Sequence, residues 1–547
     1  MSSATRSVPS PARRLPLAGV LRLGRPSDIW FKPALSVVVA VAPPNLTLLA
    51  LGRLDLAMYT MAGSLCALYA HSRPYAARAR VLAWVVVGML TGLGVALVTA
   101  SLTTNAVVLV TVGALLAAAQ KALCDATRIG PPGHVVLAFI SSASLFVPQT
   151  LGQVPGHLAL GAAAGAWAWI VGMAPGLVRP HGPERRATAH ALNAAAVSAG
   201  APDDPRARAA AAAAVHAAWQ SLLSTGARSA ARRALERLVV RAEVAIAAPS
   251  ETDPGRLRGW ARDLAGTGPL PRPDGLGDAA DELLGVEAAL ASTEQSLLRR
   301  LGPLAPIALR TALGCALAGY VSLALGVGRP YWALVTAASL YQANVTLTWS
   351  RGVQRVVGNL LGVLAFAALA PLAHVGQAAL VLCCLALNFG AEALIGRNYW
   401  LGSVCVTPMA LLITEFARSQ QPGELITARV LDTLVGALVG FAAAVAVTNR
   451  RAGDRIEGAL SMVERAQEHA AGLLAEERPE PGALEAARHG LSAAVVDLRS
   501  AADAAAGEWW QRALPEERVM RAEQAGHRTL AATVRRQGLH CWEGAQA

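Results

Sequence analysis

Two long apolar blocks, each followed by a soluble stretch, constrain the fold of this 547-residue chain more than any other feature. The first block covers residues 33–178 and the second covers residues 303–448. Each block has room for about six spans, because a helix needs about 20 apolar residues to cross roughly 30 Å of hydrocarbon. Helices satisfy their backbone hydrogen bonds internally, as continuous apolar segments in lipid require. The chain is therefore predicted to be an all-α, polytopic membrane protein.

The soluble stretches have a different composition. Residues 179–302 and 449–547 are rich in Ala and Arg, with charges at helical spacing and interruptions by Pro and Gly. Such a pattern predicts short helical bundles. Their charges are mixed in sign, which is typical of a solvated helical face rather than of a nucleic-acid surface.

The two blocks also repeat one another in detail. Leu51-Gly52 matches Leu325-Gly326, and Leu68-Tyr69 matches Leu340-Tyr341, at a separation of about 273 residues. An even number of spans in each block gives both the same orientation. We therefore expect two six-helix blocks in parallel repeat about an axis along the membrane normal, with a polar pathway between them.

The distribution of charge predicts the orientation in the membrane. The net charge of +12 is concentrated in the tail over residues 1–32 and in alternate short loops, such as residues 71–80. Basic residues collect on the cytoplasmic side of membrane proteins. Both termini and both bundles are thus predicted to be cytoplasmic, in the cytoplasmic membrane. The loop over residues 415–429 carries Arg418 where counting places the outer side, so the topology there stays open.

Several enzyme signatures are absent from the sequence. The chain has two lysines, Lys32 and Lys121, and neither follows the Gly-rich loop that ATP hydrolysis requires. Its cysteines and histidines lack zinc spacing, and there is no G-x-S-x-G motif. We therefore predict neither an enzyme nor a cofactor or metal site.

Aromatic and polar residues at the edge of one predicted span form a first candidate site. Tyr331 and Trp332 have flat rings that can stack on an organic substrate, while Thr336 and Gln342 can form hydrogen bonds to it. A membrane-interface belt also uses such rings. Both interpretations stay open.

Two arginines one helical turn apart form a second candidate. Arg351 and Arg355 precede Gly358, Asn359 and Gly362, and the two glycines permit close helix packing. The arginines either anchor the topology or bind an anionic substrate at a cytoplasmic mouth, since guanidinium pairs with carboxylate in bidentate fashion.

The last predicted span of the second block carries both charges of a third candidate. Arg429 and Asp432 lie three residues apart, so they share a helix face. A charged side chain near the bilayer centre costs about 2.5–3.5 kcal/mol on insertion scales. Either the two residues neutralise each other and orient the helix, or Asp432 carries a transported proton.

These residues belong to four stretches in which the chain resembles the fusaric acid resistance and aromatic acid exporter family. The stretches are Tyr331-Trp332 through Thr336, Arg355 through Gly362, Asn398-Tyr399 through Thr407-Pro408, and Ala428 through Gly436. Asn359 stands where the family pattern usually has Thr. The resemblance covers about a quarter of the chain, all in the second half.

The resemblance implies a secondary exporter of aromatic carboxylates or similar small organic anions, driven by the proton gradient. Its partners would be the lipid bilayer and the anion, and a homo-oligomer stays open. A passive organic-anion channel and a membrane scaffold or sensor with interaction domains are the alternatives. The candidates for the substrate pathway are Tyr331, Trp332, Thr336, Gln342, Arg351, Arg355, Asn359, Asn398, Tyr399 and Thr407, and those for proton coupling are Asp432 and Arg429.

Overall fold

The fold is helical throughout the part of the chain that the computed structural model describes. That part consists of residues 15–24, 30–224, 229–247, 249, 252–266, 268–271, 301–326, 329–373, 375–415, 421–447, 452–506 and 515–543. The prediction of an all-α membrane protein is confirmed for these residues. Residues 278–300 of the first predicted bundle lie outside them, as do residues 416–420 of the loop with open topology.

The first half of the membrane part contains long and short helices in a set order. A short helix follows the first long one, and another precedes the last. They are α1 (Phe31–Ala50), α2 (Ala57–Ser64), α3 (Tyr75–Leu102), α4 (Ala106–Thr127), α5 (Val135–Ser144) and α6 (Val154–Met173), with α7 (Pro175–Val178) leading out of the membrane part.

The second half has the same order of long and short helices. They are α14 (Ala305–Ala324), α15 (Pro330–Leu340), α16 (Val345–Ala373), α17 (Gln377–Ile395), α18 (Tyr399–Glu415) and α19 (Pro422–Ala446).

Eight helices in the described part are long and apolar enough to cross a membrane, fewer than the twelve full spans for which the sequence has room. The helices α2, α5, α15 and α18 are shorter. All residues of α15 are buried in protein, so its ends do not have to reach the two lipid interfaces. Non-helical backbone at membrane depth is tolerated where protein surrounds it.

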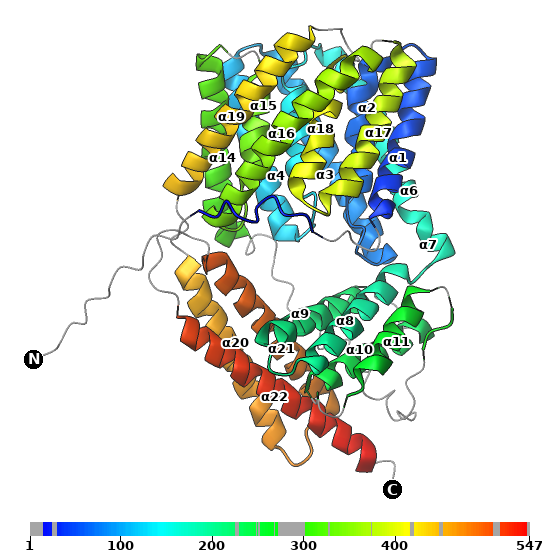
Figure 1. Cartoon of the computed structure of the whole chain (residues 1–547), viewed down its shortest axis with the longest axis vertical. Coiled ribbons are helices and arrows are strands. Elements are labelled where there is room, and N and C mark those ends of the chain that lie inside the picture. Colours follow the sequence, from blue (N-terminus) through cyan, green and yellow to red (C-terminus); the bar gives the residue numbers. More distant parts are fainter. Residues whose placement is uncertain are drawn as a thin grey trace, which may run out of the picture.

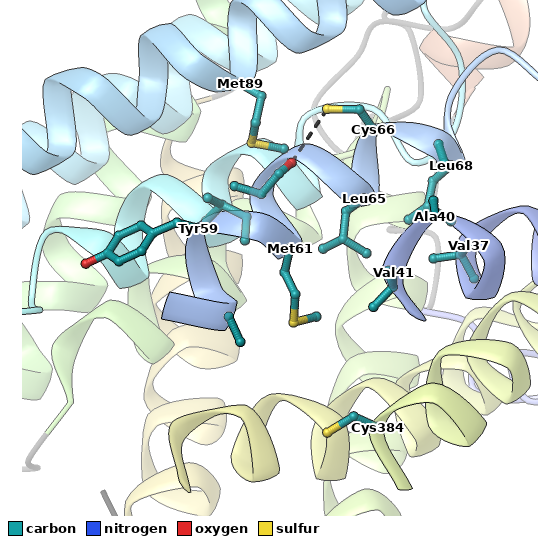
Figure 2. Packing of buried hydrophobic residues seen from close by; sticks show 14 of the residues in the cluster. Val37, Ala40, Val41, Tyr59, Met61, Leu65, Cys66, Leu68, Met89 and Cys384 are labelled. Carbon is teal, nitrogen blue, oxygen red and sulfur yellow. Dashed lines mark hydrogen bonds between the residues drawn. The ribbon is translucent and has the colours of Figure 1, made fainter. Parts of the chain in front are cut away.

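The largest apolar core joins the two halves. Val37 and Val41 of α1 and Met61 of α2 lie opposite Cys384 of α17, as Figure 2 shows. The helix α1 packs on α17, and α4 packs on α14. Counted along the chain, the first helix of each half thus packs on the fourth helix of the other half.

Glycines allow the short helices to pack closely. A Cβ atom on Gly436 of α19 would lie 2.4 Å from the carbonyl oxygen of Ala333 in α15, and one on Gly440 would lie 3.1 Å from Ala337. In the first half, a Cβ on Gly63 of α2 would meet the backbone of Gly161 in α6. Small residues four apart let helix backbones approach in this way.

The remaining helices lie together at one end of the membrane part (Figure 1). Arg488 of α21 pairs with Glu243 of α10 at 3.0 Å, which joins the helices that follow the first half to those that follow the second. These extramembrane helices are α8 (Gly182–Gly200), α9 (Pro205–Leu223), α10 (Ala230–Ala247), α11 (Pro254–Ala265), α20 (Ala452–Ala475), α21 (Pro481–Ala506) and α22 (Glu516–Glu543).

Candidate functional site

A cavity of about 1570 Å³ lies between the two halves and is lined by residues from both. At the end remote from the extramembrane helices it is lined by Asp55, which follows α1, and by Arg329, which precedes α15. At the other end it is lined by Arg128 and by Arg455 and Ser500 of the extramembrane helices. The cavity thus extends along the membrane part.

Two arginines converge on one tyrosine in the cavity wall. The guanidinium of Arg351 lies 4.0 Å from the centre of the Tyr399 ring, and Nη1 of Arg355 donates to the Tyr399 hydroxyl at 3.0 Å. All three residues line the cavity. Within the described residues no carboxylate pairs with either arginine, and Arg355 Nε has no hydrogen-bond partner. Arg355 is buried and Arg351 is partly buried, and cations in such places without a counter-charge favour an anionic ligand.

A second group of cations surrounds Trp332. The guanidinium groups of Arg329 and Arg429 lie 5.1 and 5.0 Å from the Trp332 ring, within the range of cation–π attraction. The Tyr331 ring meets the Trp332 ring edge to face, with 5.6 Å between their centres. These four residues line the same cavity, which gives it an aromatic and cationic wall.

Gln342 also lines the cavity, but Thr336, Asn359 and Thr407 do not. Asn359 Nδ2 donates to Thr433 Oγ1 at 3.0 Å, and Asn359 Oδ1 accepts from the Thr407 hydroxyl. Asn359 therefore connects α16 with α18 and α19. Thr336 packs against Gly436, where α15 meets α19. These residues hold the helices that carry the cavity wall.

Asp432 and Arg429 contact different neighbours and do not pair with each other. No ion pair within 4 Å joins them, although both are described. Asp432 Oδ1 accepts from Ser322 Oγ of α14 at 2.6 Å, whereas Arg429 points to Trp332. The two residues differ by about 60° around the helix, and α19 packs on both α14 and α15, so each side chain meets a different neighbour.

Asn398 holds the N-terminal segment formed by residues 15–24. Its Nδ2 donates to the carbonyl oxygens of Val20 and Arg22, both at 3.0 Å. Gln354 Nε2 also donates to Val20 O, at 2.9 Å, so the segment crosses the starts of α16 and α18. The sequence predicts a basic tail over residues 1–32. The apolar residues within it were the available signal that part of it packs.

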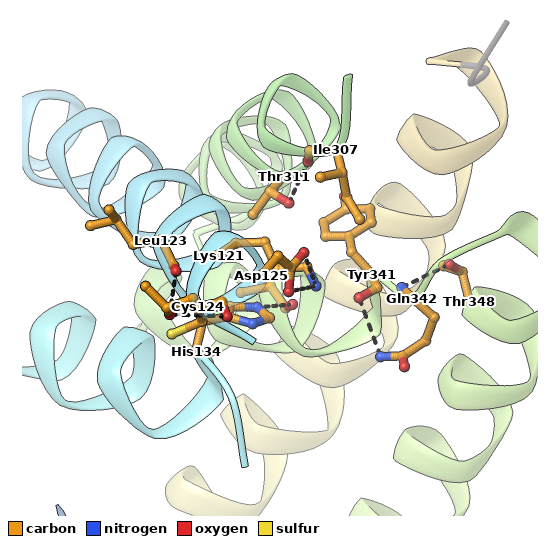
Figure 3. A network of polar contacts seen from close by, with 12 residues as sticks. Lys121, Leu123, Cys124, Asp125, His134, Ile307, Thr311, Tyr341, Gln342 and Thr348 are labelled. Carbon is orange, nitrogen blue, oxygen red and sulfur yellow. Dashed lines mark hydrogen bonds and ion pairs between the residues drawn. The ribbon is translucent and has the colours of Figure 1, made fainter. Parts of the chain in front are cut away.

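Polar residues of the first half were also missed as contributors to the cavity. Lys121 Nζ and Asp125 Oδ2 lie 2.8 Å apart on α4, beside His134 in Figure 3. His134 Nε2 donates to the carbonyl oxygen of Ala338 in α15 at 2.9 Å. Glu392 of α17 lines the cavity as well, together with Lys121, Asp125 and His134. Charged residues inside otherwise apolar helices were the signal that pointed to them.

Comparison with known protein families identifies the region that carries much of the cavity wall. Residues 316–443 match the model of the family described as fusaric acid resistance protein-like. The match begins in α14 and ends in α19, so it includes the arginine and tryptophan walls of the cavity. The chain carries a fusaric acid resistance protein-like domain. The resemblance drawn from the four sequence stretches is confirmed.

The chain is also similar to a curated membrane protein. It is 30% identical over 195 residues to the uncharacterized membrane protein YvaC of Bacillus subtilis (strain 168). The similarity spans 34% of this chain and 29% of YvaC, so the chain covers less than a third of that relative. No solved structure matches the chain. The chain is a multi-pass membrane protein.

Proposed function

We propose that the protein is a secondary active exporter of aromatic carboxylates or similar small organic anions, and that it is not an enzyme. The observation that carries this proposal is the pair of arginines at Tyr399, the partly buried Arg351 and the buried Arg355, which line the cavity without a carboxylate partner in the described part of the chain. An anion between Arg351 and Arg355 receives charge-assisted hydrogen bonds. The rings of Tyr399 and Trp332 offer flat surfaces to an aromatic group.

The transport cycle in this proposal is alternating access between two halves in parallel repeat. The equivalent helix pairs α1 with α17 and α4 with α14 support the repeat, since each joins a first helix to a fourth. Gly52 and Gly326 support it as well, because both have a φ of 66° in the turn that follows the first helix of their half. Rocking of one half against the other would open the cavity at alternate ends.

The proposal places the protein in the cytoplasmic membrane with both termini and the extramembrane helices in the cytoplasm. Asn344, directly before α16, donates to Asp503 O of the extramembrane helix α21, so Arg351 and Arg355, two to three turns further along, lie in the half of α16 nearer the extramembrane helices, in line with the positive-inside pattern. Anions in the cytoplasm would then reach the arginines from the side of Arg455 and Ser500.

Everted membrane vesicles test the export proposal. An imposed inside-acid pH gradient should drive protein-dependent accumulation of labelled hydroxybenzoates, and a protonophore should collapse it. Voltage-driven current without proton movement would indicate a passive channel instead. The absence of both, with folded protein in the membrane, would contradict transport of this substrate class.

Proton coupling through Asp432 is the finer part of the proposal. Asp432 is fully buried in a membrane helix and accepts a single recorded hydrogen bond, from Ser322. Substitution Asp432→Asn keeps an acceptor oxygen for Ser322, so folding should persist while proton-driven accumulation is lost. Glu424→Gln is the control, because Glu424 is exposed at the start of the same helix. Unchanged transport by Asp432→Asn would remove this residue from the coupling mechanism.

A further inference from the structure

Two charges occupy the same position in the two halves. Each half has its fourth helix facing the cavity, and Lys121 in α4 and Glu392 in α17 are both the sixteenth residue of that helix. The sequences agree around them: Lys121-Ala122-Leu123 corresponds to Glu392-Ala393-Leu394. Since both residues line the cavity, the repeat places opposite charges at equivalent points of its wall.

The surroundings of the two helices are equivalent too. In the first half α4 packs on α14, and in the second half α17 packs on α1. The halves therefore differ in the sign of the charge at this position, while the packing that presents it is similar. The difference makes the cavity asymmetric in charge.

The two residues also differ in whether a residue of opposite charge lies beside them. Lys121 has a partner one turn further along its helix, because Asp125 lies 2.8 Å from its Nζ. The position that corresponds to Asp125 is Gly396, which has no side chain and lies directly after the end of α17. For Glu392 no hydrogen bond or ion pair is recorded within the described residues, and its side chain is only partly exposed. An ionised carboxylate in such a place is costly unless something pairs with it.

We propose that Glu392 determines the substrate class by pairing with a protonated amine on an aromatic acid whose carboxylate binds Arg351 and Arg355. This inference rests on the proposed export function. Glu392 lies seven residues before Tyr399, on which both arginines converge, so the acidic and basic groups occupy the same end of the second half. A ligand with one charge of each sign would satisfy both, leaving neither Glu392 nor the arginines without a counter-charge.

The test compares two competitors of nearly the same shape in everted vesicles. These are 4-(aminomethyl)benzoate, which carries an ammonium group, and 4-ethylbenzoate, which has a methyl group in its place. Against uptake of labelled hydroxybenzoate, the amine should inhibit the natural protein at a concentration about tenfold lower than its ethyl analogue, which is typical of one charge-assisted hydrogen bond. In Glu392→Gln the two competitors should become about equal.

Further variants make the result decisive. Glu392→Met replaces the carboxylate by an apolar side chain and should also make the inhibitory concentrations of the two competitors about equal. This second variant keeps the test informative if Glu392→Gln fails to fold. Glu392→Asp keeps a carboxylate and should retain part of the preference. The control Glu424→Gln makes the same chemical change on the exposed end of α19, outside the cavity, and should keep the full preference.

Two results would overturn the inference. One is a natural protein that transports hydroxybenzoate but shows no preference for the amine, and the other is a preference that survives in both Glu392→Gln and Glu392→Met. In either case transport itself is intact, so the export proposal stands. A folded natural protein that accumulates no aromatic acid would instead refute the export proposal, and this inference with it.

Discussion

At the scale of single residues, the arrangement of Arg351, Arg355 and Tyr399 combines aromatic stacking with a hydrogen bond. Tyr399 occupies one face of the Arg351 guanidinium and accepts one N–H of Arg355. Arg355 Nε has no hydrogen-bond partner, and both side chains line the cavity. A guanidinium has five N–H groups and cannot lose its charge in proteins, so the site keeps its attraction for anions at any physiological pH.

Removing one of these cations should weaken substrate binding. Arg355→Gln loses a charge-assisted hydrogen bond of about 1.5–3 kcal/mol, which corresponds to a rise of roughly ten- to a hundredfold in KM. Initial rates of uptake into everted vesicles measure this change. Arg397→Gln removes the same charge from an exposed position at the same end of the protein, outside the cavity lining, and should leave KM within about twofold. Equal effects of the two variants would indicate a general influence of charge.

At the scale of helices, the short elements depend on their neighbours. All of α15 is buried, and its contact with α19 requires Gly436 and Gly440. Helix α2 contacts α6 through Gly63 in a similar way. Because α15 carries Tyr331 and Trp332, a shift of this helix would displace the aromatic wall of the cavity.

A matched pair of glycine substitutions in α19 tests this packing. A Cβ in Gly436→Ala would lie 2.4 Å from Ala333 O, so the helices must separate, at a cost of about 1–3 kcal/mol. Gly423→Ala adds the same methyl group where nothing lies within 4 Å. Thermal unfolding of the purified proteins should show a lower midpoint for Gly436→Ala alone. Equal midpoints would show that the α15–α19 contact tolerates a larger spacing.

The junction between extramembrane helices contains a buried histidine. The His489 ring in α21 lies 4.6 Å from the Trp219 ring in α9, and its Nε2 is 3.3 Å from Arg488 Nη2. Burial lowers the pKa of His489 well below its usual 6.5, and the nearby charges of Arg488 and His216 lower it further. Folding therefore keeps this ring neutral, while the unfolded chain takes up a proton below pH 6.5. The stability that His489 contributes is present above pH 6.5 and is lost as the pH falls.

Acidification should accordingly destabilise the junction, by up to about 1.4 kcal/mol per pH unit for one group. Thermal unfolding at pH 7.5 and 5.5 measures the loss, and His489→Gln should reduce it. The neighbouring Glu485 has a pKa raised to about 7 by burial, which opposes the trend, but it is present in both proteins and cancels in the comparison. A loss on acidification as large in His489→Gln as in the natural protein would contradict the assignment.

At the scale of the whole molecule, the extramembrane helices lie at one end (Figure 1). The lining of the cavity runs from residues of these helices to Asp55 and Arg329 at the opposite end. Arg455 and Ser500 contribute to its lining, so an anion that reaches the cavity from this side passes these helices. Asn344 Nδ2 also donates to Asp503 O at 3.4 Å, which links the second half to α21. The extramembrane helices are thereby placed at one end of the cavity.

The proposed orientation can be tested with single cysteines. Thr104 precedes α4 at the end remote from the extramembrane helices, and Asp203 lies between α8 and α9; both are exposed. In intact cells, a membrane-impermeant maleimide should label Thr104→Cys. It should label Asp203→Cys only after the membrane has been permeabilised. The native cysteines in the described part of the chain are buried or partly buried, so they should contribute little background labelling. The reverse labelling pattern would invert the topology.

The fold class and the basic arginine pair could be predicted from the sequence because they follow from local patterns. Apolar runs identify the membrane part, and Arg351 and Arg355 stand out as charges near the start of an apolar helix. The number of full-length spans could not be predicted in the same way. A buried helix such as α15 is as apolar as a lipid-facing one, and only its neighbours decide how long it must be.

The tertiary structure alone decided which polar residues face the cavity. The sequence predicts Asn359 as a pathway residue and Asp432 as a proton-coupling residue. Neither lines the cavity, and each contacts a neighbouring helix, because their orientation depends on how α16 and α19 pack. Glu392 and Lys121 became visible as a pair only when the two halves were folded against each other. Sequence determines that a charge enters the membrane, since hydropathy is local. Which partner the charge meets depends on contacts between residues far apart in the chain, which a single sequence does not record.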